Sequence, residues 1–164
     1  MDYVSEQRLG LVHPVLMQKI HALSDSLSGQ GIEIRVVQGL RNWADQEKLY
    51  AQGRTEPGEI VTYAPPGHSM HEFGLAVDCE PSLNGPAGPY LPDGIAGSPR
   101  YVAMVAIAEA EGLVSGSRWS HPVDWPHLQL PNAPASPTNA MRADFAAGGL
   151  SRVWENYDQG AYKP

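Results

Sequence analysis

Glycine and proline interrupt this chain so often that long helices and long strands cannot run through most of it. The 164 residues include 17 glycines and 15 prolines, about a fifth of the chain. Proline removes a backbone N–H donor and blocks a helix interior, while glycine weakens helices and strands alike. The sequence therefore predicts many loops between short elements and argues against a helical bundle.

Between these breaks, the apolar patterns predict helices and short strands in mixed order. Helices are expected from Pro14 to Gly29 or Gly31, from Asn42 to Gln52, from Ser98-Pro99 to Gly112, from Ser136-Pro137 to Gly148-Gly149 and around Leu150 to Asn156. Strands are expected at Ile32–Gln38, Gly74–Cys79 and His127–Leu130, with loops at Thr55–Met70 and Pro81–Gly97 and an irregular stretch from Val114 to Pro126. No βαβ rhythm is present. The pattern predicts an α+β fold with a small, mainly antiparallel sheet packed with helices.

Length and charge narrow the class of protein further. We expect a single domain over residues 1–164, with its core at about residues 9–156, and a monomer. The formal net charge of −7 argues against nucleic acid as a partner, because phosphate neutralisation requires Lys and Arg. No stretch approaches the roughly 18 apolar residues of a membrane helix, so no membrane insertion is expected. Residues 1–12 contain acids and no apolar run, unlike a secretory signal peptide.

Two stretches carry the residue types of a metal site. In the first, His71 and Asp78 are seven residues apart, and Gly74 between them allows a turn that brings both side chains together. In the second, Pro126 fixes the entry into a short alternating strand. His127 and Gln129 would then share one face of that strand, with Leu128 and Leu130 facing the core. Asp124 would be free to bend back over the face of His127.

Two imidazoles and one carboxylate suit Zn²⁺, and three protein ligands leave a fourth position for water, as in catalytic zinc sites. A carboxylate outside the ligand set can then take a proton and deliver it to the leaving amine, and Asp124 is the candidate for this role. His68 is an alternative ligand, although a turn carrying Pro66 and Gly67 disfavours it.

These motifs resemble those of a known family. The stretch Ser69-x-His71-x-x-Gly74-x-Ala76-x-Asp78 resembles the S-x-H-x-x-G-x-A-x-D signature of the VanY-like zinc peptidases, which include D-alanyl-D-alanine carboxypeptidases and the L-alanyl-D-glutamate endopeptidases of phage endolysins. Asp124-x-Pro126-His127 is similar to the D-x-P-H segment of the endolysin branch. The resemblance runs from about Leu9 to Trp154. It implies a Hedgehog/DD-peptidase-like fold, zinc ligands at His71, Asp78 and His127, and Asp124 as the catalytic carboxylate.

The resemblance also assigns a role to Arg41, which lies in a segment similar to the family's G-[YF]-R. It implies that Arg41 binds a substrate carboxylate or the developing oxyanion, since a guanidinium pairs with two oxygens at once. The alternative is a salt bridge with Glu33, Asp45 or Glu47.

Three further residues have open roles. Ser69 is expected to hydrogen-bond inside the site, where it could contact substrate. His121 either orients substrate or lies in solvent on a loop. Glu72 or His121 would be the base if Asp124 were not.

Two positions depart from the family pattern. The carboxypeptidase branch usually has Glu where this chain has Asp124, which favours the endolysin branch. The family's Gly-Gly-x-Trp segment appears here as Gly116-Ser117-Arg118-Trp119, so any role of the second glycine is in question.

These features favour a zinc peptidase that hydrolyses the stem peptides of bacterial peptidoglycan, most simply a phage-type endolysin that cleaves L-alanyl-D-glutamate. Without a signal peptide, such a protein would stay in the host cytoplasm and act at the cell wall after release. The alternative enzyme is a D-alanyl-D-alanine carboxypeptidase. The alternative from another class is a non-catalytic zinc-binding module. Asp124 favours an enzyme, because a structural zinc site has no need of a second carboxylate.

Overall fold

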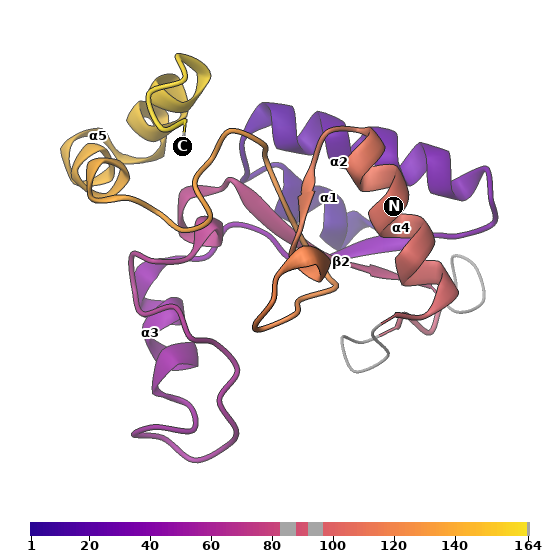
Figure 1. The fold of residues 1–164 in the computed structure, drawn as a ribbon, viewed down its shortest axis with the longest axis horizontal. Coiled ribbons are helices and arrows are strands. Elements are labelled where there is room, and N and C mark those ends of the chain that lie inside the picture. The colour runs from indigo at the N-terminus through magenta and orange to yellow at the C-terminus, as the bar shows by residue number, and fades with distance from the viewer. Residues whose placement is uncertain (83–87, 92–96, 164) are drawn as a thin grey trace. The chain divides into compact units, whose positions relative to one another are not determined.

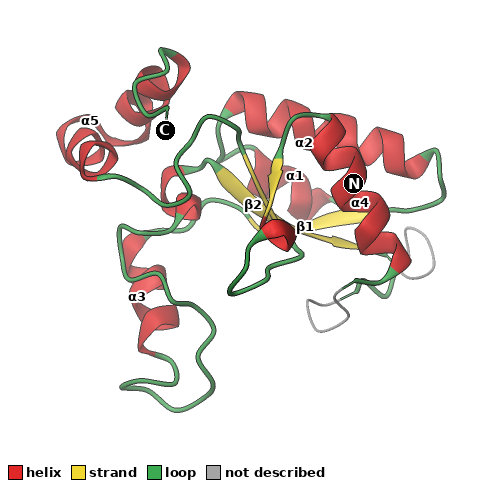
Figure 2. Cartoon of the chain, viewed as in Figure 1, coloured by secondary structure: helices red, strands yellow, loops and turns green. Residues whose placement is uncertain are grey.

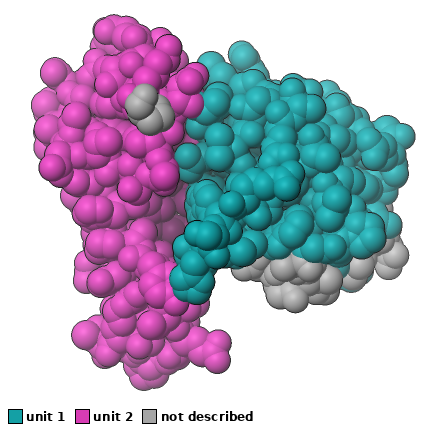
Figure 3. All heavy atoms as spheres, viewed as in Figure 1, with its two compact units in different colours: residues 1–39, 76–131 teal, residues 40–75, 132–164 magenta. Residues whose placement is uncertain are grey.

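The computed structural model describes residues 1–82, 88–91 and 97–163, so part of the expected loop at Pro81–Gly97 lies outside the described residues. The chain forms two compact units (Figure 3). Unit 1 comprises Met1–Gly39 and Ala76–Pro131, and unit 2 comprises Leu40–Leu75 and Asn132–Pro164.

Unit 1 contains a four-stranded antiparallel sheet with helices (Figure 2). Its strands are β1 (Ile34–Gln38), β2 (Ala76–Pro81), β3 (Val114–Ser115) and β4 (His127–Gln129), in the order β1-β2-β4-β3. Its helices are α1 (Tyr3–Leu9), α2 (Pro14–Ser28), α4 (Pro99–Ala110) and the short 3₁₀ turn η3 (Gly116–Arg118). The predicted α+β class with a small antiparallel sheet is confirmed. The stretch from Val114 to Pro126, expected to be irregular, contributes β3 and η3.

The two faces of this sheet carry different chemistry. Val77 and Cys79 of β2 and Leu128 of β4 are fully buried on the apolar face. Helix α2 lies beside α4, and α4 in turn contacts β2 and β3 (Figure 1). The helices add their own buried stripes: Leu16, Ile20, Leu23 and Leu27 from α2, and Tyr101, Met104, Val105 and Ala108 from α4. Because side chains alternate along a strand, the polar residues of β2 and β4 occupy the opposite face.

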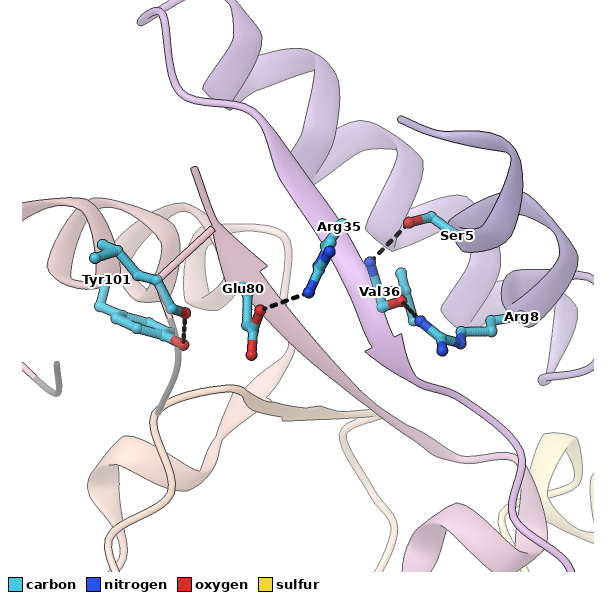
Figure 4. A network of polar contacts seen from close by, with 7 residues as sticks. Ser5, Arg8, Arg35, Val36, Glu80 and Tyr101 are labelled. Carbon is cyan, nitrogen blue, oxygen red and sulfur yellow. Dashed lines mark hydrogen bonds and ion pairs between the residues drawn. The ribbon is translucent and has the colours of Figure 1, made fainter. Parts of the chain in front are cut away.

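The helix α1 is a difference from the sequence prediction, which placed no element there. Its sequence has no apolar stripe, and only Ser5 and Leu9 are buried. Instead, Ser5 Oγ accepts a hydrogen bond from Val36 N at 2.9 Å, and Arg8 donates to Val36 O (Figure 4). Since β1 is an edge strand, these contacts satisfy backbone groups that the sheet leaves unpaired.

Unit 2 contains α3 (Trp43–Ala51), the 3₁₀ turn η1 (Met70–Phe73) and α5 (Asn139–Asp158). The helical path of α5 breaks at Gly149, whose φ of 64° and ψ of −158° are not helical. The predicted stop at Gly148-Gly149 is therefore confirmed. The helix begins slightly later than expected, because Thr138 caps it by accepting from Met141 N.

One carboxylate joins the two halves of α5 across this break. Asp144 accepts hydrogen bonds from Arg152 Nε at 2.9 Å, Asn156 Nδ2 at 2.8 Å and Tyr162 OH at 2.7 Å. These three donors, Arg152 foremost, hold the pKa of Asp144 below its usual value. Among the described residues, no helix combines the length and the apolar character needed to cross a membrane.

We predict that Asp144→Asn loosens the C-terminal half of α5 in a pH-dependent way. A carboxylate with a lowered pKa stabilises the fold above about pH 4 and loses that contribution as the pH falls through the lowered value. The variant should melt at a lower temperature than wild type at pH 7, and the difference should shrink as the pH falls through the lowered pKa of Asp144. Thermal unfolding followed from pH 2 to 7 measures this, with the exposed Asp25→Asn as control. Equal melting temperatures at pH 7 would contradict the prediction.

Candidate metal centre

The pairing of β2 with β4 places two predicted ligands opposite each other. Asp78 and His127 are direct partners in the antiparallel register, and Cys79 N donates to Pro126 O at 2.9 Å beside them. His127 Nδ1 lies 3.4 Å from Asp78 Oδ1. A direct charge-assisted N–H···O bond would be about 2.7–2.9 Å long. Two donor atoms on one tetrahedral zinc, each about 2.0–2.2 Å from it, stand about 3.4 Å apart. The observed spacing thus suits a shared cation better than a direct bond.

The surroundings of His127 also suit a cation. Burial alone would lower the pKa of this imidazole, but the neighbouring Asp78 carboxylate, together with the charge of Asp124 and the contact with Gln129, outweighs burial and raises it. The side chain is 7% exposed. Positive charge is therefore stabilised at this place, and a bound metal would supply it after displacing the proton.

The third predicted ligand, His71, lies in a tightly bonded turn. Both oxygens of the buried Glu72 carboxylate accept backbone N–H groups, from Gly67 at 2.8 Å and from Ser69 at 3.0 Å. Gly74 ends the turn with φ of 65°, a conformation that favours glycine. The observed contacts of Glu72 serve the turn, and Ser69 is the N-terminal cap of η1.

Helix α5 holds the same turn from unit 2. Trp154 Nε1 donates to Phe73 O at 2.8 Å, and Arg142 Nη1 donates to Gly67 O at 3.2 Å. A Cβ at Gly74 would lie 3.0 Å from Trp154 Cζ2, so glycine also permits the close approach of the indole. Both halves of α5 therefore restrain the segment that carries His71.

The three predicted ligands come together. His71, Asp78 and His127 each offer a ligand atom, and these atoms all lie within 4.8 Å of one another. Among the residues that the structure describes, this is the one such group of three or more acids, histidines or cysteines. His68, the alternative ligand, is exposed and outside the group. Two imidazoles and one carboxylate match the ligands of catalytic zinc.

Asp124 lies close enough to His127 for its charge to raise the pKa of that imidazole, and its role as a catalytic carboxylate stays a prediction. Its backbone N donates to Gly116 O at 3.1 Å. A Cβ at Gly116 would lie 2.6 Å from Asp124 O and 3.0 Å from His127 Cβ. The first glycine of the family's Gly-Gly-x-Trp segment is thus required by packing, whereas Ser117 is accommodated in place of the second.

Arg41 is held by a neutral group. Its backbone N donates to His71 O at 3.1 Å, and its Nη1 donates to Gln46 Oε1 at 2.8 Å. Gln46 is fully buried and in turn donates to Ala64 O at 2.7 Å. Asp45, one of the alternative partners, pairs with Lys48 at 2.8 Å, and the charge of Arg41 makes a smaller contribution to its lowered pKa. His121 is exposed in the loop before β4, and its substrate role stays a prediction.

Three neighbours of His127 make contacts that the sequence did not predict. The Trp119 ring lies with its centroid 4.7 Å from that of His127, Gln129 Oε1 lies 3.2 Å from His127 Nε2, and Gly116 adjoins His127 Cβ. The one signal for Gln129 was its position two residues after His127 on the same strand face. Gly116 and Trp119 belong to the segment that resembles the family's Gly-Gly-x-Trp, but that motif alone does not report their contacts with His127.

Known proteins share these features. The family described as VanY, D-alanyl-D-alanine carboxypeptidase, matches residues 10–115. The peptidoglycan L-alanyl-D-glutamate endopeptidase CwlK of Bacillus subtilis is 35% identical over 124 residues, which cover 73% of each protein. This chain belongs to the VanY family. Among solved structures, the L-Ala D-Glu endopeptidase ChiX of Serratia marcescens is similar, with a TM-score of 0.53 and 26% identity over 79% of this chain and 88% of ChiX. The VanY assignment agrees with the resemblance in the ligand motif.

We predict that this VanY-family chain binds one Zn²⁺ through His71, Asp78 and His127. Elemental analysis of the purified protein should give close to one zinc per chain, and His71→Ala should lose most of it, because two protein ligands hold zinc poorly. His21→Ala is the matched control, since His21 is half-exposed on α2 and pairs with Glu6. Full zinc content in His71→Ala would exclude His71 from the ligand set.

Proposed function

We propose that this protein is a zinc-dependent peptidoglycan peptidase that cleaves the bond between L-alanine and D-glutamate in the stem peptide. The observation that carries the proposal is a carboxylate, Asp124, beside a His-Asp-His cluster. The names of CwlK and ChiX, both L-alanyl-D-glutamate endopeptidases, support the choice of bond.

The residues of the cluster divide the work of hydrolysis. His71, Asp78 and His127 would hold the metal. When bound, zinc would supply a Lewis acid that polarises the scissile carbonyl and makes water a competent nucleophile at neutral pH. Asp124 in its ionised form accepts the proton of the attacking water and passes it to the departing amine. Because the base is the ionised carboxylate of Asp124, protonation of that carboxylate in acid should lower the activity.

Arg41 supplies a fixed positive charge for the substrate. We infer that its guanidinium pairs with a stem-peptide carboxylate or with the tetrahedral oxyanion. Gln46 supports this role, because a neutral amide orients the guanidinium without cancelling its charge. We keep Ser69 and His121 as proposed substrate contacts.

A second candidate activity is D-alanyl-D-alanine carboxypeptidase, which the family description names. Asp124 favours the endopeptidase, since the carboxypeptidase branch usually has Glu at this place. We propose that the protein acts as a phage-type endolysin. Lysis of intact bacterial cells by added protein tests this role.

Analysis of the reaction products tests the choice of bond. We expect digestion of purified peptidoglycan, followed by mass spectrometry, to yield fragments with a new N-terminal D-glutamate. Release of free D-alanine would identify a carboxypeptidase instead. Intact stem peptides after prolonged incubation with zinc-loaded protein would support the non-catalytic module.

We predict that Asp124→Asn keeps its zinc and its fold but loses about 10²- to 10⁴-fold in hydrolysis rate, the usual value of general acid–base help. Asp124→Glu should retain part of the rate, because it keeps the carboxylate but displaces its oxygens. Zinc content and peptidoglycan-hydrolysis rate are measured on the same samples. A zinc-loaded Asp124→Asn with the wild-type rate would show that another group is the base.

A further inference from the structure

The side chain of Gln129 makes a contact with His127 that neither the proposed ligand set nor the proposed base explains. Gln129 Oε1 lies 3.2 Å from His127 Nε2. Both side chains are buried, with 2% of Gln129 and 5% of His127 exposed. The pair lies on the polar face of the sheet, where residues two apart on one strand are neighbours.

In this hydrogen bond, His127 is the donor and Gln129 is the acceptor. An amide oxygen only accepts hydrogen bonds, so the bonded ring nitrogen of His127 carries the hydrogen. A neutral imidazole carries one N–H, which leaves the lone pair on Nδ1. Nδ1 is the nitrogen that lies 3.4 Å from Asp78 Oδ1, on the side of the metal cluster.

We propose that Gln129 is a positioning residue that holds His127 in the tautomer and ring orientation in which Nδ1 faces the metal. The inference rests on the proposed zinc function. Metal-bound histidines generally donate their second N–H to a nearby acceptor, which fixes the ring and raises its basicity as a ligand. Gln129 is that acceptor here.

The packing around the pair is consistent with this role. Ala76 is the register partner of Gln129 on β2, and its small side chain leaves room for the amide on the shared face. The Trp119 ring lies against the imidazole with a centroid separation of 4.7 Å and an interplanar angle of 46°. These neighbours limit rotation of the ring, while the hydrogen bond selects which nitrogen points to Asp78.

A neutral acceptor also fits the charge of the site. Asp78 and Asp124 already place negative charge next to His127. A glutamine orients the imidazole without adding a third buried carboxylate, whose desolvation would be costly. A glutamate at position 129 also accepts a hydrogen bond and should still orient the ring. Comparing Gln129→Glu with Gln129→Met therefore separates loss of the acceptor from a mere change of side chain.

Zinc affinity of the full chain, measured by competition with a chelator at neutral pH, tests the proposal. Gln129→Met removes the acceptor at similar volume and should weaken Zn²⁺ binding about 10- to 100-fold. Gln129→Glu should bind Zn²⁺ within a few-fold of wild type. Gln7→Met is the control: Gln7 is exposed on α1, where it contacts Tyr3, and its replacement should leave zinc affinity unchanged.

Nitrogen-15 NMR of the zinc-loaded wild type gives a second reading that does not depend on any variant. We expect the proton of His127 on Nε2 and the metal on Nδ1. A proton on Nδ1 would overturn the inference, even if Gln129→Met fails to fold. Wild-type zinc affinity in a folded Gln129→Met would also overturn it, while leaving the proposed enzyme intact. A wild-type protein that binds no Zn²⁺ would overturn both.

Discussion

The antiparallel register between β2 and β4 is the constraint on which the rest of the site depends. It pairs Asp78 with His127 and Ala76 with Gln129 on the polar face. It also buries Val77 against Leu128 on the apolar face. A slip by one residue would exchange the two faces and expose the apolar set to the polar side. Burial of the core therefore fixes the spacing of two of the proposed metal ligands, Asp78 and His127.

The turn that carries His71 is positioned differently, because it lies outside the sheet and has no strand register to align it. Its polar backbone groups are bonded by Glu72, whose buried carboxylate is acceptable only because both oxygens accept N–H donors. Trp154 and Arg142 bind the ends of the turn from α5. Helix α5 thus helps to hold the segment that carries the proposed ligand His71, although it supplies no proposed ligand itself.

The surroundings of His127 and of Arg41 differ in charge. Acidic groups gather at His127, where Asp78 and Asp124 together favour a positive charge on the ring. Arg41 is oriented by the neutral amide of Gln46. In both places a buried glutamine fixes the direction of a charged or ligating group. The inferred role of Gln129 is the metal-side counterpart of the observed role of Gln46.

The sequence by itself determined the features that depend on neighbours along the chain. Apolar periodicity and capping residues located α2, α3 and α4, and Gly148-Gly149 marked the break in α5. The two motifs named the three residues that cluster, His71, Asp78 and His127. The tertiary structure decided what depends on distant residues. Ser5 and Val36 are 31 residues apart, and Phe73 and Trp154 are 81 apart, so no local pattern reports α1 on the sheet edge or α5 on the His71 turn. The direction in which the His127 ring points was likewise decided in space, because a hydrogen bond between two buried side chains depends on the packing that encloses them.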